Sequence, residues 1–174
     1  MQAPTRPLMH LSTCLALAAA LVSQATQAGE HEHNRRVPLP QIYVQECASC
    51  HVAYPAGMLP AASWRRLMSG LDKHFGTNAT LDEQDLRFIS QWLMTHADTR
   101  NTTSPPVPQD RITRTDWFVR EHRHIEPTTW RLPSVRSASN CIACHTAADQ
   151  GSFRERELRM PAGLSASQRS AWDD

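Results

Sequence analysis

The chain has 174 residues, with 18 Lys and Arg against 17 Asp and Glu, and a formal net charge of +1. This balance, with no basic stripe, excludes nucleic acid as an expected partner. Pro (12) outnumbers Gly (6) and aromatic residues make up only 6%. The length and composition therefore predict one domain or two small lobes, rich in loops and organised around cofactors.

The first 28 residues have the pattern of a secretory signal peptide. Residues 15–22 (LALAAALV) are apolar but too short to span a membrane. Residues 26–28 (TQA) fit a cleavage site, with residues 23–25 (SQA) as the alternative. Cys14 would be removed with this segment. We therefore expect a periplasmic protein whose mature chain has no membrane span and keeps four cysteines.

Two copies of Cys-x-x-Cys-His, at residues 47–51 and 141–145, contain all four of those cysteines. This is the attachment motif of a c-type haem. On a helix the spacing brings both thiols and the imidazole to one face, so the thiols form thioethers with the porphyrin and the imidazole binds the iron. We predict two covalent haem c groups, attached by Cys47, Cys50, Cys141 and Cys144, with His51 and His145 as proximal iron ligands.

Other uses of Cys-x-x-Cys pairs fit less well. A zinc site would place the pairs about 15–20 residues apart, whereas Cys141 follows Cys47 by 94 positions. Structural disulfides within each pair would close very short loops, and a thiol oxidoreductase would carry one pair in a βαβ setting. None of these uses explains a histidine directly after each pair.

The first half of the chain predicts helices around its haem motif. Residues 29–40 form a polar lead-in, and residues 41–52 predict a short helix that carries the first motif. Residues 60–75 predict an amphipathic helix with proline in its first turn. A stripe with the helical period runs along it: Trp64, Leu67, Leu71 and His74.

A third helix is predicted from Thr80. Thr80 and Glu83 fit a capping box, with Thr80 as the N-cap. An apolar stripe follows: Leu86, Ile89, Leu93 and His96. Residues 98–111 are polar and then rich in proline, which cannot continue a helix, so we predict a linker there.

The second half, residues 112–174, predicts shorter elements. Residues 115–125 predict a short helix in which Phe118 and His122 share a face. Residues 137–148 carry the second motif, and the charged tail has one short helix. Strand patterns of useful length are absent from the sequence. We expect a mostly α c-type cytochrome with two small haem lobes (residues 29–97 and 112–174), long loops and little or no sheet.

The sixth iron ligand decides what each haem does. A methionine raises the reduction potential, a second imidazole leaves it lower, and an empty position permits ligand binding. His74 lies 23 residues after His51, and His122 lies 23 residues before His145. Both intervals leave room for a loop and a helix that faces the haem. His74 and His122 are therefore the predicted distal ligands.

Rival ligands remain at this stage. His96 also ends an apolar stripe and competes with His74, while His124 competes with His122. Methionines on helices are more often packing residues than ligands. The methionines that could in principle ligate are Met58, Met68, Met94 and Met160.

Three segments give the chain a specific resemblance: residues 47–81, which contain CASCH and GLDKHFG, residues 117–125 (WFVREHRHI) and residues 139–161 (SNCIACHTAADQGSFRERELRMP). They resemble the small periplasmic dihaem cytochromes c. The resemblance implies two bis-histidine haems of low potential, with His74 and His122 as distal ligands. It also implies redox partners, namely an oxygen-binding monohaem cytochrome of the sphaeroides type and a membrane cytochrome b.

We therefore expect an electron-transfer protein and not an enzyme. Irons with both axial positions filled cannot easily bind a substrate, but they can cycle between Fe(III) and Fe(II). The alternative is a haem enzyme or gas sensor in which one distal histidine dissociates so that the iron binds O₂, NO or peroxide. Carbon monoxide added to the reduced protein separates the two, because only an open iron binds it rapidly.

Overall fold

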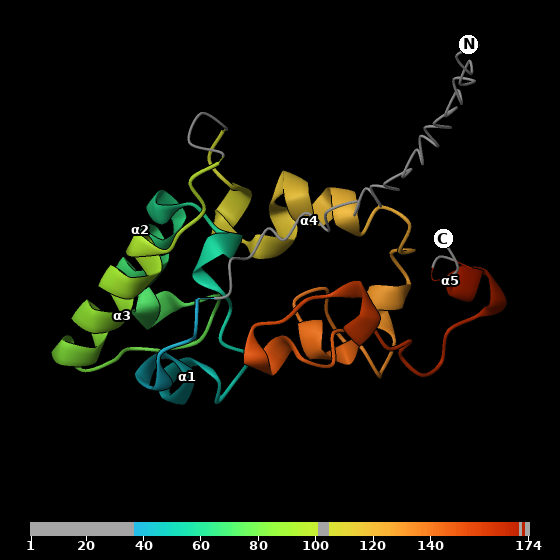
Figure 1. The fold of residues 1–174 in the computed structure, drawn as a ribbon, viewed down its shortest axis with the longest axis horizontal. Helices are drawn as coiled ribbons and strands as arrows, with labels where there is room; N and C mark the ends of the chain where they lie inside the picture. The colour runs from blue at the N-terminus through green and yellow to red at the C-terminus, as the bar shows by residue number, and fades with distance from the viewer. Residues whose placement is uncertain (1–36, 101–104, 171, 173–174) are drawn as a thin grey trace, which may run out of the picture. The chain divides into compact units, whose positions relative to one another are not determined.

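The described part of the chain is helical. The computed structural model describes residues 37–100, 105–170 and 172, which belong to one compact unit. Within them, five α-helices and short 3-10 turns are joined by loops, and the only β contacts are isolated bridges (Figure 1). The predicted mostly α fold is confirmed. The predicted signal peptide, residues 1–28, lies outside the described residues.

Three helices build the core of the first half. They are α1 (Gln41–Cys47), α2 (Ala61–Ser69) and α3 (Glu83–Thr95). α2 packs along α3, and α1 also contacts α3 (Figure 1). Apolar side chains that recur at the helical period are removed from water where these helices meet. The large buried side chains of this core include Tyr43, Leu59, Trp64, Ile89 and Leu93.

α2 ends earlier than the sequence pattern predicts. The helix stops at Ser69 with Gly70 as its C-cap, and a 3-10 turn (Leu71–Lys73) follows. Glycine in a helix costs about 1 kcal/mol relative to alanine, which favours a stop at this point. Next come His74 in an extended conformation and Phe75 and Gly76 with φ of 49° and 95°. A turn, rather than a helix face, therefore presents His74.

The N-terminus of α3 differs from the predicted capping box. Asp82 is the N-cap, and its carboxylate accepts hydrogen bonds from the amides of Gln84 and Asp85 at 2.9 and 3.0 Å. Thr80 instead donates its hydroxyl and its amide to the side chain of Asn78. A carboxylate also interacts favourably with the helix dipole. The predicted start at Thr80 is thus wrong by two residues.

The second half has less regular structure. α4 (Asp116–Glu121) begins after Thr115, whose hydroxyl accepts a hydrogen bond from the Phe118 amide, and α5 (Ala166–Ser170) lies near the end of the chain. The second haem motif begins with a 3-10 turn (Cys141–Ala143), and the first begins on the last residue of α1. The helix predicted over residues 41–52 is therefore shorter than the sequence suggests.

Polar contacts join segments that are far apart in sequence. Arg66 of α2 donates two hydrogen bonds to the Asp110 carboxylate, at 2.9 and 2.6 Å. The Tyr54 hydroxyl donates to the carbonyl of Ser139 at 2.8 Å.

The division into lobes at residues 98–111 stays a prediction. None of the helices in the described residues is long and apolar enough to cross a membrane.

Candidate haem sites

The structure brings His51 and His74 together. Their ring centroids are 6.2 Å apart, and the ring planes make an angle of 32°. His51 lies four residues beyond the end of α1, and His74 comes from the turn after α2. The Nδ1–H of His51 donates to the carbonyl of Val52 at 2.7 Å, which leaves Nε2 of this ring available to a metal.

The second pair consists of His122 and His145. Their ring centroids are 6.1 Å apart, with an angle of 67° between the planes. His122 is the C-cap of α4, and its Nδ1–H donates to the carbonyl of Phe118 one turn earlier, at 2.9 Å. The ring of His122 is therefore held at the helix end with its Nε2 free.

Both ring separations fit one iron between two imidazoles. A ring nitrogen binds a metal at about 2 Å and lies roughly 1.2 Å from its ring centroid, so two ligands on opposite sides of one ion would have centroids about 6.4 Å apart. The observed separations are 6.2 and 6.1 Å. The two pairs thus have the spacing that axial ligation of one iron each would require.

Burial favours the neutral imidazole of His74, His122 and His145, which is the form that binds a metal. Desolvation lowers the pKa of His74, and the neighbouring His51 and Arg111 lower it further. The pKa of His122 is also lowered by desolvation, against an opposing hydrogen bond to Phe118. For His145, desolvation and the nearby His122 lower the pKa to about 4.

One ring in each pair has an unsatisfied nitrogen. The Nδ1 atoms of His74 and His145 are buried without a hydrogen-bond partner. A buried polar atom without a partner costs about 1–3 kcal/mol, so such atoms concentrate where another function holds the residue in place. Metal ligation through the opposite nitrogen would supply that function.

The cysteines lie beside these pairs as free thiols. Burial raises the pKa of Cys47 and of Cys141 to about 11. Within residues 37–100, 105–170 and 172, no group of three or more His, Cys, Asp or Glu side chains is placed to hold a metal ion. Each pair therefore supplies only two ligands, and a porphyrin would supply the equatorial ones. The donor set fits haem.

The rival histidines lie elsewhere. The Nδ1–H of His96 donates to the Trp92 carbonyl at 2.8 Å, and its ring packs on the Trp92 ring at 5.1 Å, so this histidine completes the end of α3. His124 is exposed, two residues beyond His122. Among the described rings, neither is seen to approach His51 or His145.

Aromatic side chains line the second pair of histidines. Phe118 stacks on His122 at 4.0 Å with the planes 17° apart, and Trp130 lies 5.9 Å from the same ring. Phe153 lies 5.2 Å from His145. The sequence indicated Phe118 by its spacing. Trp130 lies in a 3-10 turn (Thr129–Arg131) and Phe153 in a loop, and no periodic sequence pattern marks either residue.

The aromatic side chains around the first pair enclose it less than those around the second. Tyr54 stacks on His51 at 4.8 Å, with the planes 21° apart. Phe75 packs edge-on against His74 at 4.8 Å and is 47% exposed. The guanidinium of Arg111 lies 4.2 Å above the Phe75 ring, in a cation–π contact. The sequence did not indicate Tyr54 or Arg111.

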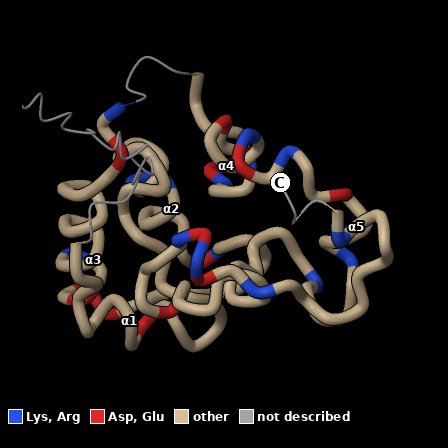
Figure 2. The backbone as a smooth tube through the Cα atoms, turned by 45° about the vertical axis from the view of Figure 1, so that its right-hand side comes forward, with Lys and Arg blue, Asp and Glu red and all other residues tan. Residues whose placement is uncertain are grey.

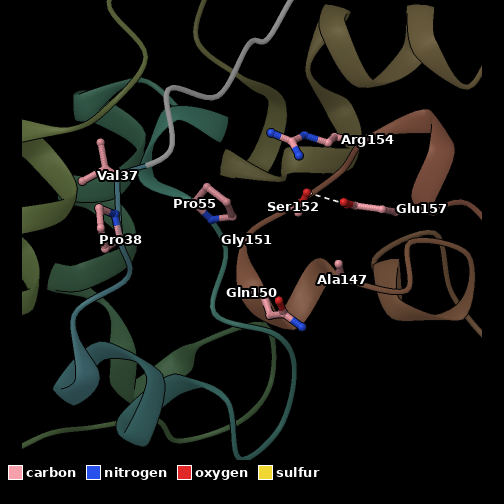
Figure 3. A pocket seen from close by; sticks show the side chains of 9 residues that line it. All are labelled: Val37, Pro38, Pro55, Ala147, Gln150, Gly151, Ser152, Arg154 and Glu157. Atoms are coloured by element: carbon pink, nitrogen blue, oxygen red, sulfur yellow. Dashed lines mark hydrogen bonds between the residues drawn. The ribbon is translucent and has the colours of Figure 1, made fainter.

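A cavity of about 310 Å³ opens beside the segment after the second motif (Figure 3). Its lining comes from Val37, Pro38 and Pro55 in the first half of the chain and from six residues of the second half: Ala147, Gln150, Gly151, Ser152, Arg154 and Glu157. Ser152 donates a hydrogen bond to Glu157 at its edge. The lining lacks cysteine and histidine, so this cavity offers no ligand to a haem iron.

Basic and acidic residues are intermixed along the described backbone (Figure 2). Some charged groups pair with near neighbours in sequence, as in the Arg120–Glu121 contact of 3.0 Å on α4. The intermixing agrees with the near-neutral composition.

Comparisons with known proteins agree with this geometry. The sequence model of the family described as dihaem cytochrome c matches residues 43–153, a range that includes both haem motifs and the two predicted distal ligands, His74 and His122. The chain belongs to the dihaem cytochrome c family. A comparison with curated protein sequences returns no match.

Solved structures of dihaem cytochromes are similar to most of this chain. The dihaem cytochrome of type c from Shewanella baltica OS155 is 38% identical, with a TM-score of 0.62 over 72% of this chain and 96% of that one. DHC purified from Rhodobacter sphaeroides is 40% identical, with a TM-score of 0.57 over 67% and 99% of the two chains. Family membership gives this cytochrome two covalent haem c groups and a role in electron transfer.

Proposed function

We propose that this cytochrome carries electrons through two bis-histidine haems of low potential, without catalysing a reaction of its own. His51 and His74 would hold the first iron, and His145 and His122 the second. Thioethers to Cys47 and Cys50, and to Cys141 and Cys144, would fix the two porphyrins, one in residues 29–97 and one in residues 112–174. The observation that carries the proposal is the spacing of both imidazole pairs, 6.2 and 6.1 Å between centroids.

The bound haem supplies an iron that cycles between Fe(III) and Fe(II). The protein supplies neutral imidazoles on both sides, so the coordination need not change when an electron arrives. His51 and His122 donate hydrogen bonds from Nδ1 to backbone carbonyls, which fixes the rings and makes them stronger donors. Stronger donors favour the ferric state, which supports the low potential in the proposal.

The cellular setting is also part of the proposal. Proteins of this class are typically exported, which supports a periplasmic location with cleavage near Ala28. Partners would be redox proteins, among them an oxygen-binding monohaem cytochrome and a membrane cytochrome b. Contacts with such partners should be transient and sensitive to salt, since charged surfaces steer encounter.

The test is a redox titration of the haem-loaded protein combined with low-temperature EPR. We expect two low-spin ferric signals and two midpoint potentials below those of cytochromes with His–Met ligation. The signals should differ because the imidazole planes make angles of 32° at one site and 67° at the other. A high-spin ferric signal at either site would contradict bis-histidine ligation.

Carbon monoxide tests the enzyme or sensor alternative. It should not bind rapidly to the reduced protein if both axial positions are filled. Fast, stoichiometric binding at one haem would overturn the electron-carrier proposal and support a haem that opens to bind a gas or peroxide.

A further inference from the structure

Tyr54 makes contacts with both haem sites. It lies three residues after His51, in the loop between α1 and α2. Its ring stacks on the His51 imidazole, with centroids 4.8 Å apart and planes 21° apart. An aromatic ring in this position limits how far the imidazole can rotate.

The hydroxyl of Tyr54 reaches the other half of the chain. It donates a 2.8 Å hydrogen bond to the carbonyl of Ser139, two residues before Cys141. A phenol hydroxyl is a hydrogen-bond donor, so this contact reaches the segment that leads into the second attachment motif.

The backbone around Tyr54 is fixed as well. The buried Tyr43 of α1 donates its hydroxyl to the Tyr54 carbonyl at 2.8 Å. The next residue, Pro55, packs close to Gly151, since a Cβ added at Gly151 would lie 3.6 Å from the Pro55 ring. Tyr54 and Pro55 thus contact the second half at two separate places.

We propose that Tyr54 is a positioning residue that ties the His51 imidazole of the first haem site to the attachment segment of the second. The ring acts on the first site and the hydroxyl acts on the second. This inference rests on the proposed ligation by His51 and His145. The side chain of Tyr54 would thus connect two haem attachment segments that lie almost a hundred residues apart in sequence.

Two substitutions separate the two contacts. Tyr54→Phe keeps the ring on His51 and removes the hydrogen bond to Ser139. Tyr54→Leu removes both. Each haem-loaded variant is compared with the wild type by ferric EPR and by redox titration, which report on each haem separately.

We expect Tyr54→Phe to shift the EPR signal and midpoint potential of the second haem, and to leave the first within the scatter of repeat titrations. Tyr54→Leu should shift both haems. A matched control is Asp110→Asn, which weakens another long-range contact, the ion pair with Arg66, without touching a ligand. It should leave the signal and the potential of the second haem unchanged.

The proposal is overturned if Tyr54→Phe leaves the second haem unchanged, or if Asp110→Asn produces the same shift. The wild-type spectrum distinguishes this failure from a failure of the proposed function. Two low-spin bis-histidine signals in the wild type, unaffected by Tyr54→Phe, would reject the role of Tyr54 alone, whereas a high-spin wild-type signal would reject the ligation on which it rests.

Discussion

The two candidate haem sites share a donor set but hold their distal imidazoles differently. His122 is fixed by a helix end, by a hydrogen bond to the Phe118 carbonyl, and by the flanking rings of Phe118 and Trp130. His74 comes from a turn that includes positive φ angles, and its Nδ1 has no partner. The same ligand types therefore do not imply the same haem properties at the two sites, because the surrounding residues fix the orientation of each imidazole ring and the access of solvent and ligands to the iron.

The proximal side shows the reverse arrangement. His51 is anchored through Nδ1 to the Val52 carbonyl, whereas Nδ1 of His145 is buried without a partner. Each site thus has one anchored and one unanchored imidazole, on opposite sides of the porphyrin plane in the proposed ligation. In the first site the anchored ring belongs to the attachment motif, and in the second site it lies at the end of α4.

The largest expected effect comes from replacing the distal ligands one at a time. His74→Met should raise the potential of the first haem, and His122→Met that of the second, because thioether sulfur favours Fe(II). We expect a rise on the order of 0.1–0.3 V, within the roughly 0.8 V range that axial ligands span. Redox titration of each haem-loaded variant measures it.

Each variant carries its own internal control, since the other haem should keep its potential. His96→Met and His124→Met serve as matched controls and should leave both potentials unchanged. A variant at His74 or His122 that kept bis-histidine spectra at both haems would show that another residue is the ligand there.

A second comparison concerns the aromatic neighbours of the proposed distal ligands, namely Phe118 beside His122 and Phe75 beside His74. Phe118 is 8% exposed, whereas Phe75 is 47% exposed. Phe118→Ala should lower the free energy of unfolding by about 3 kcal/mol, and Phe75→Ala by less than about 1 kcal/mol, as for a surface substitution. Urea unfolding of the haem-loaded proteins measures both. Equal losses would show that the two distal sites are enclosed to the same degree.

The predictability of these sites differs with their local structure. The stacking of Phe118 on His122 follows from a spacing of four residues on a helix, so the sequence pattern indicated it. The attachment motifs and the α3 core stripe were equally visible, since each has a fixed spacing. The sequence pattern predicted that His74 would lie on a continuous helix that runs through Gly70. The structure instead places His74 after a turn, because α2 ends at Ser69 and Gly70 is its C-cap.

Contacts between distant segments were not predictable from the chain alone. Tyr54 meets Ser139 across 85 positions, and Arg111 meets Phe75 through the packing of a linker against a turn. No period or motif relates such residues, since loop packing decides which of them meet. The capping error at Thr80 has a local cause, because two residues with capping side chains lie close together and Asp82 is the better placed.

The charge beside the first site gives a smaller prediction. The Arg111 guanidinium covers Phe75 next to His74 and contributes to the lowered pKa of that histidine. A nearby cation favours Fe(II), so Arg111→Gln should lower the potential of the first haem by on the order of 10–40 mV, as expected for a partly screened charge. The second haem should not change. A shift of both haems would mean that the effect is not local to the first site.

The smallest effect concerns acid stability in the half that holds the first site. The Arg66 guanidinium donates to Asp110 and holds the pKa of that carboxyl below its ordinary value of 3.8. The stability from this pair is therefore present above pH 3.8 and is lost as the pH falls through the lowered pKa of the folded state. Because Arg66 is half exposed, Asp110→Asn should cost only about 0.5–1 kcal/mol at pH 7.

Urea unfolding of wild type and Asp110→Asn, measured from pH 7 downwards, tests this sign. The difference between the two proteins should be constant near neutral pH and should close in acid, because protonation of Asp110 removes the same interaction. The second half has pairs between adjacent residues, such as Arg156–Glu157 at 3.9 Å, so Glu157→Gln should show a smaller difference at every pH. A gap for Asp110→Asn that widened in acid would mean that Asp110 does not stabilise the folded state as a carboxylate.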